Sequence, residues 1–283
     1  MPFFKVVVLA IVQGLAELLP VSSSAHVVVA EKLMGLDPSS PPMTLLLVML
    51  HTGTMFAVIA YFWNRWRSTY FADGPQFRAF ALRVILATAL TGVIGEGLKV
   101  LIEKTVLHNV PHAEIEDLFS HLEWIAPALA AAGILILWAG LTQARAPAAG
   151  LSLRQSALIG AVQGLCLPLR GFSRSGATIS TGMLAGVERA RAESFSFALA
   201  VALTPAADAR EVLRVVRAAH SAGAGAVTAA VAPSLLGAVL AFLAGLLALR
   251  WLSQVLEAGR WQLFGIYCLA AAAVVGWLHY LGY

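Results

Sequence analysis

Two long apolar segments of this chain, residues 3–35 and 155–188, are each interrupted near the middle by a short polar stretch. The first interruption reads LPVSSSAH and the second reads LPLRGFSRSGAT. Each half of such a segment is shorter than the about 20 apolar residues that a helix needs to cross a bilayer. Non-helical backbone persists at membrane depth only inside protein or beside a water-filled cavity. We therefore expect each segment to form a re-entrant helix–loop–helix whose tip points into the protein.

Uninterrupted apolar stretches of spanning length make up most of the remaining chain. Charged residues account for 12% of the sequence, against roughly 25% in a soluble domain, which leaves too little charge to cover a water-facing surface. The sequence thus predicts an all-α polytopic membrane protein with six spans. A cleaved signal peptide at the N-terminus is the alternative for the first segment, but Gln13 and Glu17 interrupt the part that should be apolar. The six stretches are residues 43–63, 79–101, 123–143, 193–215, 225–249 and 261–281.

The two interrupted segments resemble each other. Both contain the sequence VQGL, after which Ser23 and Ser173 fall at equivalent positions, and three apolar stretches follow each copy. Because three is an odd number, the second copy must lie upside down relative to the first. The pattern predicts one membrane domain, residues 1–283, built from an inverted repeat of about 1–145 and about 151–283. Chance similarity between two Gly/Ser-rich segments is the alternative.

The arginines of the predicted loops indicate an orientation. If the spans alternate, Arg65, Arg67, Arg78, Arg145, Arg154, Arg189, Arg191, Arg250 and Arg260 all lie on one side. The loop at 103–123 falls on the other side with Glu103, Glu114, Glu116, Asp117 and Glu123. The positive-inside rule makes the arginine side cytoplasmic and puts both termini outside. Arg210, Arg214 and Arg217 run against this scheme. The net charge of +4 comes with no lysine-rich run, so nucleic acid is not an expected partner.

The first tip combines groups suited to acid–base chemistry. Gln13 and Glu17 are four residues apart and share one helix face. An ionisable group in a membrane segment usually marks a functional site or a buried partner, although Glu17 could instead reach interfacial water. His26 follows across the proline, and a turn could fold it back toward Glu17 for proton transfer.

Three consecutive serines, Ser22, Ser23 and Ser24, precede the second half of this hairpin. Serine is a common helix N-cap, and capping explains at least one of them. A helix N-terminus with free amides and hydroxyls also attracts anions. A serine beside a His–Glu pair is in addition a candidate nucleophile.

The second tip has the composition of a phosphate cradle. Arg170 and Arg174 supply guanidinium groups, and the glycines let successive backbone amides turn toward an anion. A structural ion pair between Arg174 and Glu17 is the alternative. A cation clamp on one tip and acid–base groups on the other together suit phosphoryl transfer. Of the ionisable residues within or near the spans, His51 could line the cavity, while Glu96 and Asp208 receive no role. The tip also contains Ser173, Ser175, Gly176 and Thr178.

The paired motifs QGLAELLPVSSSAH and RGFSRSGATIS resemble the undecaprenyl-diphosphate phosphatase family, also called the bacitracin-resistance family. The family's (E/Q)-x-x-x-E motif falls on Gln13 and Glu17, and its serine-rich turn ending in histidine falls on residues 22–26. Its P-G-x-S-R-S-G-x-T motif falls on residues 170–178. Arg170 departs from the motif's proline, and Gln13 stands where a glutamate is more familiar.

This resemblance implies a bacterial inner-membrane enzyme with its active site open to the periplasm. It would hydrolyse undecaprenyl diphosphate to the monophosphate and inorganic phosphate, and so recycle the lipid carrier of peptidoglycan synthesis. Family members depend on a divalent cation, Mg²⁺ or Ca²⁺, here with Glu17 as the expected ligand, and they are often homodimers. A transporter or flippase for a phosphorylated lipid is the alternative function. The resemblance makes Glu17, Ser23, His26 and Arg174 the catalytic core, with Gln13, Ser173 and Thr178 supporting it. Together with the chemistry of the two tips, this gives the expected substrate-binding residues: Gln13, Ser22, Ser24, Arg170, Ser173, Ser175, Gly176 and Thr178.

Overall fold

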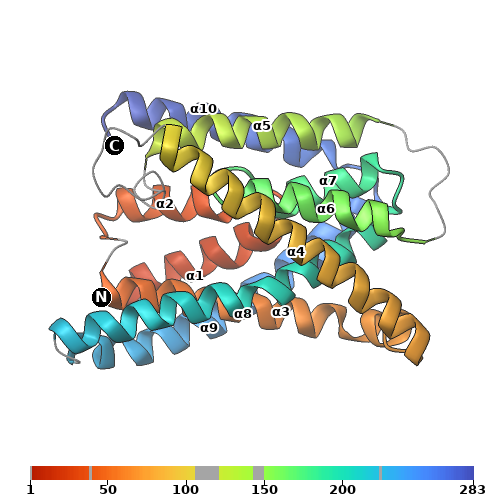
Figure 1. Ribbon diagram of the computed structural model, residues 1–283. Coiled ribbons are helices and arrows are strands. Elements are labelled where there is room, and N and C mark those ends of the chain that lie inside the picture. The colour runs from red at the N-terminus through yellow and green to blue at the C-terminus, as the bar shows by residue number, and fades with distance from the viewer. Residues whose placement is uncertain (1, 38–39, 106–120, 143–149, 223–224) are drawn as a thin grey trace.

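The computed structural model describes residues 2–37, 40–105, 121–142, 150–222 and 225–283 of the chain. Every regular element in these ranges is an α-helix, which confirms the all-α prediction (Figure 1). The helices are α1 (Phe3–Leu18), α2 (Ser23–Leu33), α3 (Pro41–Thr69), α4 (Gly74–Thr105), α5 (Leu122–Leu141), α6 (Leu153–Cys166), α7 (Arg174–Leu184), α8 (Arg189–Ala222), α9 (Gly225–Glu257) and α10 (Gln262–Tyr280).

Five helices in the described part of the chain are long and apolar enough to cross a membrane, namely α3, α4, α5, α9 and α10. They coincide with five of the six predicted spans and support a polytopic membrane protein. The sixth predicted stretch, residues 193–215, lies within α8, which is 34 residues long. Asp208 and Arg210 add charge to its second half.

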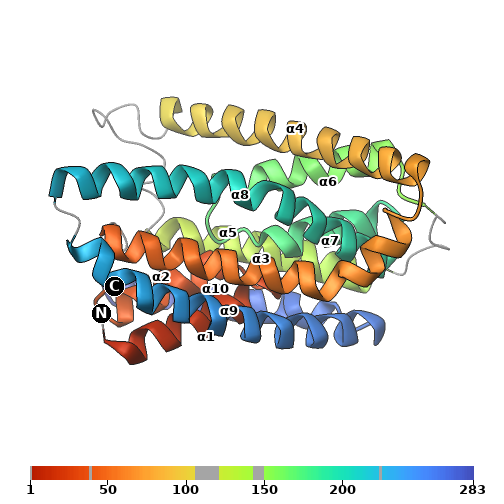
Figure 2. The same ribbon diagram turned by 90° about the horizontal axis from the view of Figure 1, so that it is seen from below.

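The long helices run side by side and give the molecule two distinct ends (Figures 1 and 2). α3 packs along α9, and α5 packs along α10. Both chain termini lie at the same end, on the left in Figure 1. The candidate spans run in a common direction, and the chain would cross a bilayer along it.

Two hairpins of short helices lie between the long ones. α1 and α2 form a hairpin on the side of the chain termini, and α6 and α7 form one toward the opposite end (Figure 1). The longest of the four helices has 16 residues, and at about 1.5 Å per residue it falls short of a hydrocarbon core of roughly 30 Å. The tips touch. Ser175 Oγ donates a hydrogen bond to the Leu19 carbonyl at 3.2 Å, and the Gly171 N–H donates to Ser24 Oγ at 3.3 Å.

Each tip turns through a residue with left-handed backbone conformation. Ser22 has a φ of 68° and Gly171 has a φ of 98°, a region that glycine enters freely and other residues enter only at a cost. A Cβ atom on Gly171 would also lie 2.5 Å from the Ile125 carbonyl oxygen of α5. The second tip therefore needs glycine both for its turn and for its close approach to α5.

A glycine at the equivalent position of each hairpin brings its first helix against a long helix. A Cβ atom on Gly14 would lie 2.6 Å from the Cβ of Ala244 in α9. A Cβ atom on Gly164 would lie 2.9 Å from the Thr91 carbonyl oxygen in α4. Small residues that let backbones approach closely are typical of helix packing in membranes. The glycine of each VQGL sequence thus lets its helix pack closely against a long helix. α1 packs against α9, and α6 packs against α4.

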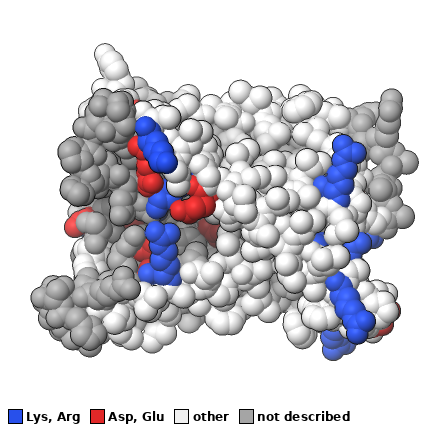
Figure 3. Space-filling model, in the orientation of Figure 1, with Lys and Arg blue, Asp and Glu red and all other residues white. Residues whose placement is uncertain are grey.

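Figure 3 shows one face of the molecule, on which charged side chains are visible near its two ends. On the face shown, acidic and basic side chains surround a recess at the left end and basic side chains mark the right end, with an uncharged band between them. The right end holds the α3–α4, α7–α8 and α9–α10 connections, near which most of the predicted arginine cluster lies in the sequence. Arg145, Glu114, Glu116 and Asp117 lie outside the described residues.

Candidate active site

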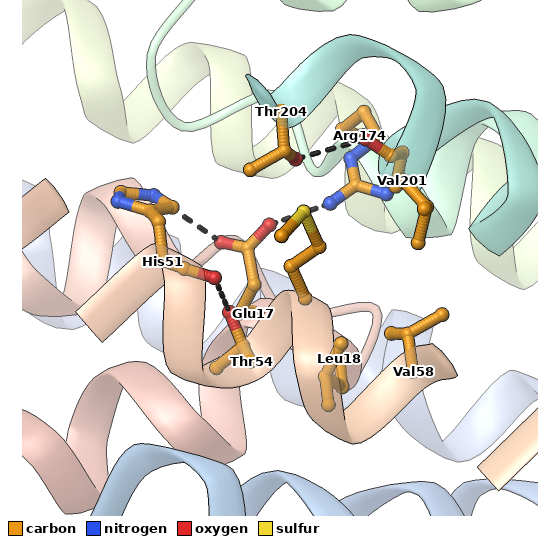
Figure 4. A pocket seen from close by; sticks show the side chains of 10 residues that line it. Glu17, Leu18, His51, Thr54, Val58, Arg174, Val201 and Thr204 are labelled. Atoms are coloured by element: carbon orange, nitrogen blue, oxygen red, sulfur yellow. Dashed lines mark hydrogen bonds and ion pairs between the residues drawn. The ribbon is translucent and has the colours of Figure 1, made fainter. Parts of the chain in front are cut away.

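Glu17 stands where the two hairpin tips meet. It lies in the last turn of α1, and its Oε1 binds Arg174 Nη2 at 2.5 Å (Figure 4). Its Oε2 accepts a hydrogen bond from Ser23 Oγ at 2.6 Å. Both side chains of the ion pair are largely buried, at 15% exposed for Glu17 and 21% for Arg174. One carboxylate therefore joins a guanidinium from the second tip to a hydroxyl from the first.

Gln13 lies one turn before Glu17 on the same face of α1, as its spacing predicts. Its side chain is buried, and Nε2 donates to Glu17 Oε2 at 3.1 Å. Oε2 thus receives two hydrogen bonds while Oε1 holds the ion pair. Three donors fix the carboxylate as an anion and fix its orientation.

The three serines of the first tip have different partners. Ser22 is the N-cap of α2, and its Oγ accepts from the Ala25 N–H at 3.5 Å, so the expected capping role belongs to Ser22. Ser24 Oγ accepts from the Gly171 N–H and ties the two tips together. Among these three serines, only Ser23 forms a hydrogen bond to Glu17 in the described structure.

The second tip begins helix α7 at Arg174. Ser173 is its N-cap and accepts from the Gly176 N–H at 3.2 Å. Thr178 Oγ1 turns back to the Arg174 carbonyl at 2.8 Å and contacts Ser196 Oγ at 2.6 Å. Ser173, Gly176 and Thr178 therefore support the turn that carries Arg174.

Arg174 retains an unused donor. Its Nη1 atom is buried and has no hydrogen-bond partner among the described residues. An unsatisfied buried donor is uncommon because it carries a desolvation cost of about 1–3 kcal/mol. Arg174 and Glu17 line a small pocket together with His51, Thr54 and residues of α8. The residue that carries this unpartnered donor therefore lines the pocket together with Glu17, the partner of Ser23.

Arg170 takes no part in lining this pocket. Its guanidinium interacts electrostatically with Glu31, a buried residue of α2. The two arginines of the second tip thus have different carboxylate partners: Arg174 binds Glu17, and Arg170 interacts with Glu31.

His26 lies differently from the sequence expectation. Its Nδ1 is 2.8 Å from the Ser22 carbonyl oxygen, and its Nε2 is 2.7 Å from the hydroxyl of Tyr267 in α10. The two rings stack with centroids 5.7 Å apart. Because a carbonyl only accepts, Nδ1 carries a hydrogen, and in the neutral ring Nε2 accepts from Tyr267. The expected contact between His26 and Glu17 is therefore wrong: α2 directs Ser23 toward Glu17 and the imidazole toward α10.

His51 of α3 is the imidazole that lies beside Glu17 in the structure (Figure 4). Its Nε2 is 3.8 Å from Glu17 Oε2. The sequence pointed to His51 only as a polar side chain inside an apolar span. Thr204 of α8 also lines the pocket, and no sequence signal distinguished it from other span threonines.

The described side chains do not form a ready-made protein site for a divalent cation. No group of three or more His, Cys, Asp or Glu residues in the described ranges is arranged to hold a metal ion. Both oxygens of Glu17 are occupied by donors, and Gln13 offers an amide N–H instead of a second carboxylate. Mg²⁺ and Ca²⁺ bind through several oxygen ligands, carboxylates above all. No step proposed below uses a metal ion.

Comparison with known proteins identifies close relatives. A model of the family described as bacitracin resistance protein BacA matches residues 6–274. The chain is 56% identical over 278 residues to Undecaprenyl-diphosphatase 2 of Acinetobacter baylyi, which covers 97% of each chain. It is 35% identical to Undecaprenyl-diphosphatase 2 of Burkholderia thailandensis over 98% of this chain and 97% of that protein. Undecaprenyl-diphosphatase 1 of Burkholderia pseudomallei is 34% identical with the same coverage.

Proposed function

The chain belongs to the bacitracin resistance protein BacA family, and from this premise we propose that it hydrolyses undecaprenyl diphosphate to undecaprenyl phosphate and inorganic phosphate. The Acinetobacter and Burkholderia relatives are named for this activity, and the chain aligns with nearly the whole length of each. Within the structure, the observation that carries the proposal is the unpartnered Nη1 of Arg174 beside the Ser23–Glu17 hydrogen bond. Such a site can hold a phosphate oxygen next to an activated hydroxyl.

Arg174 acts as the phosphate clamp in this proposal. The guanidinium is planar, permanently charged and able to donate two parallel hydrogen bonds to a phosphate. Nη1 is available at once, and Nη2 can shift from Glu17 to the substrate. Negative charge that develops on the transferred phosphoryl group is then stabilised by a donor already in place.

Ser23 is the proposed nucleophile and Glu17 its base. The Oγ–H bond breaks as Oγ forms a bond to the terminal phosphorus, and the proton passes to Glu17 Oε2 along the 2.6 Å hydrogen bond. The bond from phosphorus to the bridging oxygen breaks, and undecaprenyl phosphate leaves. Water then attacks the phosphoserine and gives up one proton. The bond from phosphorus to Ser23 Oγ breaks, and protonated Glu17 returns its proton to Oγ, which restores the Ser23 hydroxyl and releases inorganic phosphate.

His26 enters the proposal at the second step, as the base that activates this water. The Ser22 carbonyl fixes its tautomer and leaves the Nε2 lone pair as the basic position. The Tyr267 hydroxyl occupies Nε2 in the structure and would be displaced by the water.

Replacing these two residues separately tests this role. We expect His26→Gln to lower kcat about 100-fold, the ordinary size of general-base catalysis. Tyr267→Phe should change kcat by less than about tenfold, the size of one hydrogen bond. Phosphate release is measured for both variants in the same detergent. If kcat fell equally in the two variants, the His26–Tyr267 pair would have a structural role, and His26 would not be the base.

We further propose six spans and two re-entrant hairpins arranged as an inverted repeat, with repeats of about 1–145 and 151–283. Three observations support this arrangement. The two tips touch, the hairpins lie toward opposite ends of the molecule, and Gly14 and Gly164 make equivalent close contacts with a long helix. In it, α8 supplies the sixth span.

The proposed location is the bacterial inner membrane, with the arginine-rich end in the cytoplasm and the site open to the periplasm. The positive-inside rule supports this orientation, and so does the charged recess at the opposite end (Figure 3). Recycling of the peptidoglycan lipid carrier follows from the activity. A homodimer rests on family resemblance alone and is tested by the mass of the detergent-solubilised protein.

One assay separates hydrolysis from transport. Purified protein in detergent should release inorganic phosphate from undecaprenyl diphosphate, whereas a transporter or flippase requires a sealed membrane and would release none. An inactive wild-type protein that nevertheless moves the lipid between leaflets of a vesicle would overturn the proposed hydrolysis.

A further inference from the structure

A cavity of about 240 Å³ lies between α1, α3 and α9, apart from the pocket that Glu17 and Arg174 line. All three helices begin at the end of the molecule that holds the chain termini (Figure 1). We infer that this cavity binds a lipid made of a single apolar chain that ends in a hydroxyl group. The inference goes beyond the proposed function and does not depend on it. The lining of the cavity includes Val6 of α1, Leu46 of α3, and Ala229, Ala230, Pro233 and Ser234 of α9.

The cavity is a local opening beside a closely packed contact between helices. A Cβ atom on Gly237, about one turn beyond Pro233 in α9, would lie 2.9 Å from the side chains of Leu46 and Leu50 in α3. α9 therefore touches α3 closely at that level, and the space opens only nearer the helix beginnings. Protein interiors contain few voids larger than a water molecule, and an apolar cavity of about 150 Å³ is large enough to bind benzene. The cavity here has room for a short apolar chain.

The lining is mostly aliphatic, which selects an apolar occupant. Val6 and Leu46 are buried and belong to one hydrophobic cluster with Leu9 and Leu50. No described residue of the lining carries an ionisable side chain. A water molecule needs two to four polar partners and would find few of them here, whereas removal of a hydrocarbon chain from water is favourable. The greater part of the ligand is therefore hydrocarbon.

Two polar groups of α9 interrupt this aliphatic lining. Ser234 is 1% exposed, and its Oγ has no hydrogen-bond partner among the described residues. A buried hydroxyl without a partner is uncommon, because it loses its hydrogen bonds to water and gains none in return. Pro233 lies inside the helix and has no backbone N–H, so the Ala229 carbonyl lacks its usual helical donor. Both Ala229 and Ser234 line the cavity.

A single hydroxyl on the ligand serves both of these groups, because a hydroxyl donates and accepts at once. It would donate to the Ala229 carbonyl and accept from the Ser234 Oγ–H. An ether oxygen or an ester carbonyl only accepts, and would leave the Ala229 carbonyl unpaired. A carboxylate or a phosphate would bring a negative charge, and no described residue of the lining is a cation. The two polar groups therefore favour an alcohol at the end of the apolar chain.

Photolabelling tests the site with full-length protein in phospholipid nanodiscs, and the probe is 1-octanol that carries a diazirine on its chain. We expect saturable labelling of the peptide that contains residues 229–234. Unlabelled 1-octanol should compete, and octyl methyl ether should compete about tenfold less well, because it cannot donate a hydrogen bond. Ser234→Ala should weaken the affinity for the probe about tenfold. Without the probe, this variant should melt no lower than the wild type, because the lost hydroxyl has no partner in the described structure.

Two substitutions on α9 give a matched pair. Ala230→Leu fills the cavity and should abolish saturable labelling, whereas Ala232→Leu makes the same change at an exposed position outside the lining and should retain it.

The inference is overturned if the alcohol and the ether compete equally, or if Ser234→Ala labels as well as the wild type, because the cavity would then accept any apolar chain. Absence of saturable labelling in the wild type, or its persistence in Ala230→Leu, overturns the inference as well. If Ser234→Ala does not fold, Pro233→Ala is measured with the same expectation, because it restores the N–H that the Ala229 carbonyl lacks. The readout is labelling and not phosphate release, so this inference and the proposed function fail independently.

Discussion

Arg174→Ala is expected to abolish phosphate release, with kcat/KM falling by about 1,000-fold or more. The loss has two causes. The substrate loses a bidentate donor that neutralises charge in the transition state, and removal of such an arginine commonly costs about 10³–10⁵ in rate. Glu17 also loses its ion-pair partner at 2.5 Å. The measurement is steady-state phosphate release from undecaprenyl diphosphate by the purified variant.

Stability must be measured alongside activity, because removing one partner of a buried ion pair costs about 3–5 kcal/mol. Arg174→Lys keeps the charge and loses the planar fork, so it should fold and still lose most of the rate. Arg170→Ala is the comparison on the same tip and should cost less than about tenfold, because Arg170 does not line the pocket. Near-wild-type turnover in Arg174→Lys would contradict the bidentate clamp.

Ser23→Ala is expected to lower kcat by about 1,000-fold or more, because it removes the atom that bonds to phosphorus. Its hydrogen bond to Glu17 at 2.6 Å is lost as well. The variant should still bind substrate, because Arg174 remains in place. Acid-quenched wild-type protein, digested and weighed by mass spectrometry, should contain a phosphorylated peptide that includes Ser23.

Ser24→Ala serves as the matched control for this experiment. Ser24 Oγ accepts a hydrogen bond from the Gly171 N–H, and Ser24 makes no contact with Glu17 in the described structure. Ser24→Ala should therefore lower kcat by less than about tenfold. If Ser23→Ala kept most of the wild-type rate, serine could not be the nucleophile and direct attack by water would take its place.

The sequence predicted the parts of the site whose position depends on spacing along one helix. Gln13 and Glu17 share a face because a helix repeats every 3.6 residues. The interrupted apolar segments predicted that each polar tip turns inside the protein, because polar backbone needs partners there. The ion pair between Glu17 and Arg174, which the structure shows, was the alternative to the phosphate cradle, and the cost of a buried charge is what suggested it.

The sequence did not predict the directions of the histidines. Ser23 and His26 lie three positions apart on α2, and a small change in where the helix begins rotates either one toward Glu17. The left-handed φ of Ser22 sets that beginning, and it turns His26 to Tyr267. His51 reaches Glu17 only because α3 packs beside α1, a contact between segments that no local pattern encodes.

The amino-acid sequence by itself determined that this chain lies in a membrane, where it breaks its helices and which groups it can bring to phosphate. These follow from the transfer cost of polar and charged groups, which each segment carries with it. Only the tertiary structure decided which imidazole stands beside Glu17 and which arginine keeps a free donor. Those outcomes depend on the rotation of packed helices about their axes, and that rotation is fixed by close contacts such as Gly14 on α9 and Gly164 on α4.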